Sequence, residues 1–418
     1  MSETTTDDAA AKPLPYPMAR GCPLHPPAEY ATLRAEQPVH RAVLPSGRPV
    51  WLVSRHDLVR QVLTDPRIST DRFHPGFPHL FRSLQTAPVE PREQPRLNPA
   101  LMGRAFSVDG PEHAARKRLL VTEFTVKRVE QLRPRIQEIV DGYLDEMLAG
   151  DNPTDLVQAL SLPVPSQVIS ELLDVPPADR PFFLEHTRTM VDHASTVEQR
   201  QSANLAVLGK IDEFVTRRER EHGDDLLSRV IARNAESGTL THDEIVGVAA
   251  FLLISGFETT ANMISMGTIG LLEHPEQRDL LIADPSLAGA AVDELLRYFS
   301  VSDPAGSRVA LEDVELGGTV IPAGEGVIAL AGAANWDESV FTDPAALDIR
   351  RADARRHLAF GHGAHKCLGV HLAQLELEVV FGTLFRRIPG LRLAAPAEEL
   401  RYKEHANIYG VFEVPVSW

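Results

Sequence analysis

The sequence predicts a mainly α-helical protein with a minor β part, folded as a single large domain. Segments with helical period follow one another between residues 111 and 300. Short segments typical of strands lie near the N-terminus and in two stretches after residue 306. The 32 prolines are spread along the chain, and no linker separates independent domains. We therefore assign residues 1–21, which begin polar and alanine-rich, to a flexible tail and residues 22–418 to one domain.

The N-terminal elements are short and precede a long loop. Ser46-Gly47 provides the turn of a hairpin, and Asp65-Pro66 ends a helix. Residues 72–108 are rich in proline, phenylalanine and glycine and have weak periodicity. We expect them to form an irregular loop of the kind that is usually functional or disordered. The elements expected before this loop are a helix at 28–35, strands at 39–44 and 49–53, and a helix at 56–64.

Helices dominate from Pro111 onward, and strands return near the C-terminus. The expected helices span 111–122, 126–148, 166–173, 197–222, 224–234, 242–272, 286–300 and 370–388. The expected strands span 307–310, 314–316, 319–321 and 327–330, with further strand character between 391 and 416.

Composition limits the function classes. A net charge of −16 disfavours a general nucleic-acid binder, because phosphate binding needs a basic face. The two cysteines, Cys22 and Cys367, lie far apart, so we expect no disulfide framework and a reducing cytoplasm. No signal peptide or membrane anchor is visible, and the most apolar stretch, 245–254, is too short to span a bilayer. We expect a soluble cytoplasmic protein that binds neither nucleic acid nor membrane.

A cysteine at a helix start is the clearest chemical signal. The last long helix follows the run Phe360-Gly361-His362-Gly363-Ala364-His365-Lys366-Cys367-Leu368-Gly369. Glycines let the backbone adopt positive φ and pass close to a flat ligand. Unpaired N–H groups at a helix start favour a thiolate, which is an axial ligand for haem iron. The alternative is a buried, inert cysteine, which the three glycines and two histidines of the run disfavour.

The long helix at 242–272 carries a polar group of residues in its middle. The helix is apolar on nearly every face through Ile254, so it should cross the core. A buried carboxylate such as Glu258 is costly without a partner or a task. Thr259 can donate to the carbonyl of Ser255 and bend the helix, which would create a notch for dioxygen and a relay water. Alternatively, Glu258 lies at the surface and Thr259 only packs, while Phe257 should face away from the notch.

The cysteine run resembles the haem signature of the cytochrome P-450 family, Phe-Gly-x-Gly-x-His-x-Cys-x-Gly, at every fixed position. The resemblance extends from about Cys22 to Trp418. It implies the P-450 fold, with haem b held between the central long helix and the helix after the cysteine. It also implies that Cys367 ligates the iron. The other cofactor-binding residues that it implies in this run are Phe360, Gly361, His365 and Gly369.

The same resemblance implies roles for other residues. Thr259 would steady the bound oxygen and Glu258 would feed protons, although Ser255 stands where Ala or Gly is usual. The haem propionates would be bound by His113, Lys117, Arg308 and His365. Lys117 stands where the family more often has Arg, and it is flanked by Arg116 and Arg118, so the assignment within this trio stays open.

The resemblance also implies which residues support the scaffold and which contact the substrate. Glu294 and Arg297 would form a buried structural pair that is completed by Arg351 or, alternatively, Arg350. Ser302, Asp303 and Tyr409 would orient a polar substituent of a bulky hydrophobic substrate. The expected pocket residues are Phe77, Phe81, Met102, Phe251, Ser255, Val301, Ser302, Ile408 and Tyr409.

The resemblance is to the soluble actinobacterial branch, which often modifies macrolides, polyenes and terpenoids. It implies a monomeric monooxygenase that uses O₂ to hydroxylate or epoxidise such a molecule. The chain lacks a dinucleotide fingerprint and a ferredoxin-like cysteine cluster, so electrons should come from a ferredoxin and its ferredoxin reductase. The alternatives are a haem enzyme with an atypical outcome, such as desaturation, rearrangement or coupling, and a non-catalytic haem-binding protein. The residues expected to dock a ferredoxin are Arg116, Arg118, Arg355, Arg356 and Lys366.

Overall fold

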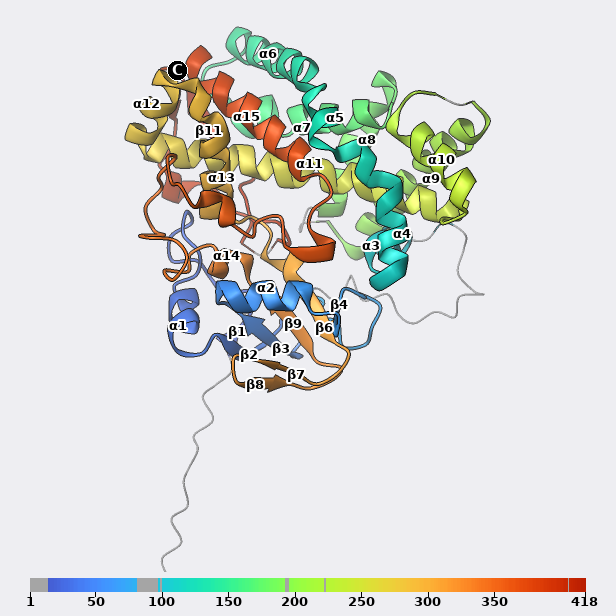
Figure 1. Ribbon diagram of the computed structural model, residues 1–418. Helices are drawn as coiled ribbons and strands as arrows, with labels where there is room; N and C mark the ends of the chain where they lie inside the picture. The colour runs from blue at the N-terminus through green and yellow to red at the C-terminus, as the bar shows by residue number, and fades with distance from the viewer. Residues whose placement is uncertain (1–13, 81–96, 98–99, 192–194, 222, 405) are drawn as a thin grey trace, which may run out of the picture.

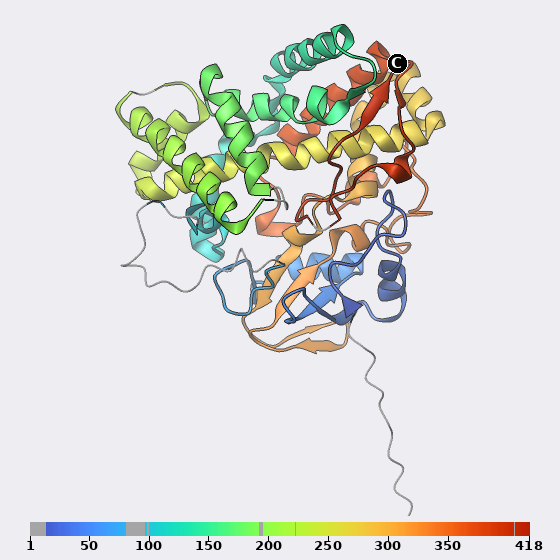
Figure 2. The ribbon, with the colours of Figure 1, turned by 180° about the vertical axis from the view of Figure 1, so that it is seen from behind.

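The computed structural model describes residues 14–80, 97, 100–191, 195–221, 223–404 and 406–418. A large helical part lies above a smaller β part in Figure 1, and helix α11 (His242–Glu273) crosses the helical part. The reverse view places the C-terminal strand beside these helices, away from the larger sheet (Figure 2). The mainly α class with a minor β part is confirmed.

Helix α11 is the axis of the core. It begins with a capping box, in which Thr241 and Glu244 bond each other's backbone N–H groups. Most of its residues from Ile245 to Leu271 are buried. Its length and apolar composition would suffice to cross a membrane, yet 67% of the relevant window is buried inside the protein, as in a core helix. The helices packed against it are α3 (Ala100–Phe106), α7 (Pro163–Leu172), α9 (Val197–Arg220) and α15 (Val370–Arg387).

Two glycines of α11, Gly247 and Gly267, let neighbouring helices of the protein approach it closely. A side chain at Gly247 would place its Cβ 2.7 Å from the carbonyl oxygen of Leu101, so α3 crosses α11 at backbone contact. A Cβ at Gly267 would overlap the ring of Phe381 on α15. The remaining α-helices of the described residues are α1 (Glu29–Glu36), α2 (His56–Thr64), α4 (Gly110–Val121), α5 (Val126–Glu130), α6 (Arg133–Ala149), α8 (Arg180–Val191), α10 (Leu226–Ser237), α12 (Pro275–Ala283), α13 (Ala288–Phe299) and α14 (Ala331–Ala334).

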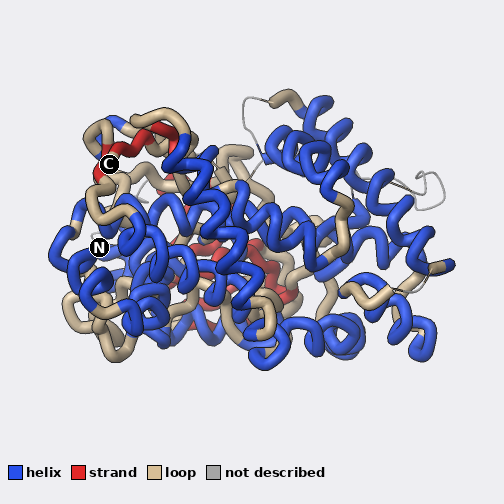
Figure 3. Tube along the Cα trace, turned by 90° about the horizontal axis from the view of Figure 1, so that it is seen from above, coloured by secondary structure: helices blue, strands red, loops and turns tan. Residues whose placement is uncertain are grey.

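The main sheet has six strands in the order β1-β2-β3-β9-β6-β4 and lies beneath the helices (Figure 3). The predicted hairpin is present, with Val39 opposite Val53 and Val43 opposite Pro49. The six strands of the main sheet are β1 (Leu14–Pro15), β2 (Val39–Val43), β3 (Pro49–Val53), β4 (Ile68–Ser69), β6 (Ser307–Ala310) and β9 (Gly326–Ala329). Two smaller sheets contain β7 (Val314–Leu316) with β8 (Thr319–Ile321), and β5 (Thr154–Asp155) with β10 (Arg392–Leu393) and β11 (Pro415–Ser417).

Several sequence predictions need correction. Residues 14–21 are not part of a free tail, because β1 pairs with β2 and the side chains of Tyr16 and Met18 are buried. The loop expected at 72–108 contains helix α3. The helix expected at 126–148 is two helices, and Pro134 lies in the first turn of the second, where a missing N–H costs nothing. Helices α8 and α12 were not predicted.

A histidine joins the start of α11 to α9. The ring of His242 contacts Asp212 through Nε2 at 2.7 Å and Glu219 through Nδ1 at 2.9 Å. Burial lowers the pKa of His242, but the hydrogen bonds and charges of the two carboxylates outweigh it and raise this pKa above 6.5. The charged ring therefore stabilises the α9–α11 contact.

Replacing His242 with Gln is expected to remove up to about 1 kcal/mol of stability, and only at low pH. Because the pKa is raised in the folded state, this stabilisation is complete below the unfolded pKa of about 6.5 and is lost as pH rises through the folded pKa. Urea unfolding of both proteins across a pH series measures the difference. A difference that grows toward alkaline pH would contradict the expectation.

Candidate active site

The cysteine loop has a constrained backbone. Gly361 and Gly363 adopt φ of 69° and 73°, as the sequence predicts for glycines in this run. A Cβ at Gly363 would also lie 2.8 Å from the carbonyl oxygen of Leu63, so only glycine lets the loop pack against the end of α2. The amide of Cys367 donates to the carbonyl of Phe360 at 2.9 Å and closes the loop before α15 begins.

The Cys367 thiol is accessible yet surrounded by protein. Burial raises the pKa of this thiol. The N–H of Gly369 and the positive charges of Lys117 and Lys366 oppose that rise. Coordination to a metal would hold the sulfur as a thiolate. At Gly369, two residues after the cysteine, a Cβ would meet nothing within 4 Å, so the space beside this glycine is open.

The polar residues of α11 have the predicted local geometry. The Thr259 hydroxyl donates to the carbonyl of Ser255 at 3.1 Å. Glu258 is buried, so the interpretation of this residue as a surface carboxylate is wrong. Phe257 is buried as well, consistent with a packing role. The Ser255 hydroxyl donates to the carbonyl of Phe251 at 2.7 Å, so its proton is engaged within the helix while the side chain stays exposed.

Cationic side chains gather near the cysteine loop. The rings of His113 and His365 lie 3.9 Å apart, and His365 Nε2 contacts Asp109 at 2.9 Å. Burial, with the positive charges of His365 and Lys117, lowers the pKa of His113 to about 4. Although burial opposes it, hydrogen bonds from His365 and two hydroxyl groups hold the pKa of Asp109 well below its usual value. Sequence reasoning missed Asp109, whose position just before α4 was its only signal.

The surroundings of Arg308 show whether the site fits an anionic cofactor. Its guanidinium is buried on β6 and donates to the carbonyls of Ala305 and Ser307. Within the described ranges no carboxylate lies at ion-pair distance from it, and burial lowers its pKa to about 10. A buried cation of this kind needs an anionic partner. The residues present therefore fit a flat group that carries carboxylates.

The trio on α4 has separate roles. Lys117 Nζ donates to the carbonyls of Ala364 at 2.5 Å and Lys366 at 3.4 Å, so it faces the cysteine loop. Arg116 points away from it, because its guanidinium is buried between Glu112 and Glu244 at 2.7 and 2.6 Å. The expectation that Arg116 docks a partner protein is therefore wrong.

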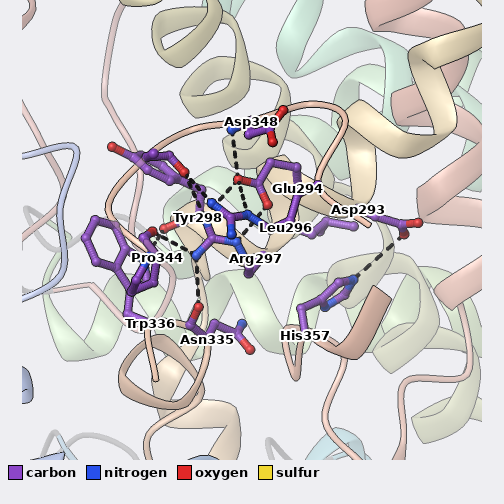
Figure 4. Close-up of polar contacts among 12 residues, drawn as sticks. Asp293, Glu294, Leu296, Arg297, Tyr298, Asn335, Trp336, Pro344, Asp348 and His357 are labelled. Carbon is purple, nitrogen blue, oxygen red and sulfur yellow. Dashed lines mark hydrogen bonds and ion pairs between the residues drawn. The ribbon is translucent and has the colours of Figure 1, made fainter. Parts of the chain in front are cut away.

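The ion pair of Glu294 and Arg297 is fully buried, and Figure 4 shows the polar contacts around it. Arg297 donates to both oxygens of Glu294, at 2.7 and 2.8 Å, and neither side chain has any exposed surface. The third member is Arg351, whose Nε lies 3.1 Å from Glu294, and not Arg350. Arg297 also donates to the carbonyls of Asn335 and Pro344, so the cluster ties α13 to the segments that lead into the cysteine loop.

The contacts in the structure bring together only some of the residues that the sequence predicts for the substrate pocket. Phe251 packs against Phe106 with ring centroids 4.9 Å apart, which joins α11 to α3. Phe106 was not predicted, because the loop interpretation of this segment hid its helical register. Met102 is buried on the same helix. Phe77 is buried beside His79. Phe81 lies outside the described residues.

The polar groups expected to orient a substrate are engaged elsewhere. The Tyr409 hydroxyl donates to the carbonyl of Pro23 at 2.8 Å, and its amide donates to Val301 at 2.7 Å. Asp303 accepts from Tyr30 and from the amide of Gly332. Tyr409 and Asp303 therefore fasten the C-terminal and N-terminal segments together. Ser302 and Ile408 are half-buried, and the Ser302 hydroxyl has no hydrogen bond within the described part of the chain.

Comparison with known proteins decides the family. The family model described as Cytochrome P450 matches residues 281–388. Pentalenic acid synthase of Streptomyces avermitilis is 45% identical over the full length of both chains. This chain belongs to the cytochrome P450 family. Its P450 fold matches the crystal structure of cytochrome P450 MoxA from Nonomuraea recticatena with 52% identity and a TM-score of 0.87, covering 97% of this chain and 98% of the other.

A second P450 structure carries a bound natural product. The mycinamicin VIII C21 methyl hydroxylase MycCI from Micromonospora griseorubida, bound to mycinamicin VIII, is 38% identical with a TM-score of 0.87. The match covers 97% of this chain and all of that one. The chain is thus a P450 monooxygenase, an oxidoreductase whose relatives act on natural products, and its family implies a thiolate-ligated haem.

Proposed function

We propose that this P450 binds haem b through the Cys367 thiolate and inserts one oxygen atom from O₂ into a bulky hydrophobic natural product. The outcome would be hydroxylation of a C–H bond or epoxidation of an alkene. The proposal rests on the glycine-shaped cysteine loop and on the buried cation Arg308, which interacts electrostatically with Asp109, the partner of His365 in that loop. When bound, the haem supplies the O–O cleavage chemistry, which a thiolate ligand assists.

The residues of the chain have distinct tasks in this proposal. Lys117 and Arg308 would supply positive charge to the two propionates, and His113 and His365 would bind them through hydrogen bonds. Phe360, Gly361 and Gly369 would shape the loop that holds the haem against Cys367. Glu258 would pass protons toward the oxygen site, and the hydroxyl of Thr259, the next residue on α11, would steady the oxygen.

The substrate would lie against α11, α3 and the two loops that follow α13 and α15. We propose Met102, Phe251, Val301 and Ile408 as its apolar contacts, with Phe77 and Phe81 from the loop after β4. Ser255 and Ser302 are the polar groups left to orient it. A macrolide, polyene or terpenoid fits this mainly apolar lining. The two free cysteines fit a reducing cytoplasm, where we propose that the protein acts as a monomer.

Electrons would come from a ferredoxin and its ferredoxin reductase. The exposed cations proposed to meet an acidic ferredoxin are Arg118, Arg355, Arg356 and Lys366. Arg355 also pairs with Asp293 at 2.9 Å. Arg118 follows Lys117, which contacts the cysteine loop, and this proximity supports the proposal that Arg118 contributes to docking on the cysteine side.

Changing Arg118 to Glu is expected to raise the KM for a plant-type ferredoxin about fivefold at low ionic strength, because one attraction becomes a repulsion. The effect should fade in 0.5 M salt as the charges are screened. NADPH oxidation at varied ferredoxin concentration measures it. Arg220→Glu, an equal charge change at an exposed position on α9, should leave the KM unaltered. Equal effects of the two changes would refute the docking surface.

Labelled oxygen tests the proposed reaction. A panel of macrolides, polyenes and terpenoids is first screened for a shift of the haem Soret band on binding. Turnover of any binder under ¹⁸O₂ should place one label in the product. A product without label would establish an atypical outcome such as desaturation or coupling. Binding without turnover, with competent redox partners, would establish a haem carrier.

A further inference from the structure

The C-terminal hairpin, residues 402–411 without the undescribed 405, packs on α11 beside Glu258. Tyr402 pairs with Val411, and the amide of Lys403 donates to the carbonyl of Gly410 at 2.8 Å. A Cβ at Gly410 would overlap the Asn262 side chain, so the hairpin backbone lies directly against α11. The Asn262 amide in turn donates to the Glu258 carbonyl at 2.9 Å. These contacts fix the hairpin at the level of Glu258.

The hairpin directs a cation toward the buried carboxylate. Lys403 Nζ lies 3.8 Å from Glu258 Oε1. Only 16% of the lysine side chain and 9% of the glutamate side chain are exposed. Charges this far removed from water interact more strongly than an exposed pair does. Removing the lysine charge would take away the ion-pair partner of a buried carboxylate.

Two opposing effects act on the carboxyl group. Burial raises the pKa of Glu258 above its usual value, and the positive charge of Lys403 opposes that rise without cancelling it. On α7, the apolar side chain of Ile169 lies against Gly256, two residues before Glu258, and brings no charge there. The protonation of Glu258 therefore depends on the position of Lys403.

We propose that Lys403 is a positioning residue for Glu258, which keeps the carboxylate ionised and oriented toward the C-terminal hairpin until it takes up a proton. The inference rests on the proposed function, in which Glu258 feeds protons to the oxygen site. It adds a residue from a segment far away in sequence, 145 positions after Glu258 (403 − 258).

The hairpin also connects this ion pair to the proposed substrate contacts. Its tip carries Ile408 and Tyr409, and the Tyr409 amide donates to Val301 at 2.7 Å. A substrate that displaces the tip would move Lys403 relative to Glu258, because the tip and Lys403 belong to the same short hairpin. Substrate binding and proton supply would then be coupled through the chain itself.

Infrared spectroscopy of the haem-loaded protein tests the proposal without a substrate. The protonated Glu258 carboxyl gives a C=O stretch that is assigned by its loss in Glu258→Gln. In the wild type this band should grow only on acidification. In Lys403→Met it should persist to higher pH, and in Lys403→Arg it should follow the wild type. Lys127→Met, the same change at an exposed lysine, should have no effect on the band.

Indistinguishable titrations of wild type and Lys403→Met would overturn the proposal. Unfolding temperature and the carbon monoxide spectrum of each variant show whether the fold and the haem site are intact. A destabilised Lys403→Met with an unmoved titration would show a merely structural lysine and would also overturn it. Failure of the proposed function is separate, because it appears as a missing thiolate-haem spectrum in the wild type.

Discussion

Replacing Cys367 with serine is expected to abolish the red-shifted Soret band of the reduced, carbon monoxide-bound protein. The thiolate is the only sulfur in the loop that Gly361 and Gly363 shape, and a serine hydroxyl stays protonated and binds iron poorly. Loss of residues that only support a metal ligand costs 10–100-fold in affinity or activity, so loss of the ligand itself should cost more than about 100-fold in turnover. Absorption spectroscopy and NADPH-supported oxidation measure both effects.

Cys22→Ser is the matched control, since it makes the same atomic change at the other free cysteine. It should keep the thiolate spectrum and the activity. Retention of the red-shifted band in Cys367→Ser would assign the iron ligand to another residue. Loss of the band in Cys22→Ser would contradict the assignment equally.

Sequence reasoning succeeded where the determinants are local. The hairpin at residues 39–53 and the long core helix are encoded by side-chain period and by turn residues, which act over a few positions. The hydrogen bond from Thr259 to Ser255 follows from helix geometry alone. The cysteine loop is likewise a continuous run, so its glycine conformations could be predicted.

The errors concern contacts between distant segments. Arg116 looks like a surface cation on α4, and only the tertiary fold brings Glu244 to it. Tyr409 looks like a pocket residue, but the N-terminal segment places the Pro23 carbonyl at its hydroxyl. Residues 14–21 have too few strand signals to be predicted, and they are ordered because β2 offers an unpaired edge. Lys403 had no local signal, since its partner is on α11.

Replacing Glu294 with alanine is expected to destabilise the protein by about 3–5 kcal/mol, the cost of breaking a buried ion pair from one side. The change leaves Arg297 and Arg351 without a carboxylate, and Arg297 has no access to water. It also removes the acceptor for the Asp348 amide at 3.0 Å. Because natural proteins are stable by only about 5–15 kcal/mol, little folded protein should survive moderate urea.

Glu130→Ala is the control variant, because it breaks an ion pair that is not buried and so shows how much of the Glu294→Ala effect is due to burial. Glu130 and Arg133 have the same spacing and order as Glu294 and Arg297, but their side chains are 50% and 41% exposed. Water solvates the remaining arginine there, so the cost should be within about 1 kcal/mol. Urea unfolding of both variants, followed by circular dichroism, gives the comparison. Equal losses would mean that burial of the Glu294 cluster contributes nothing, and that the segments before the cysteine loop are held by other contacts.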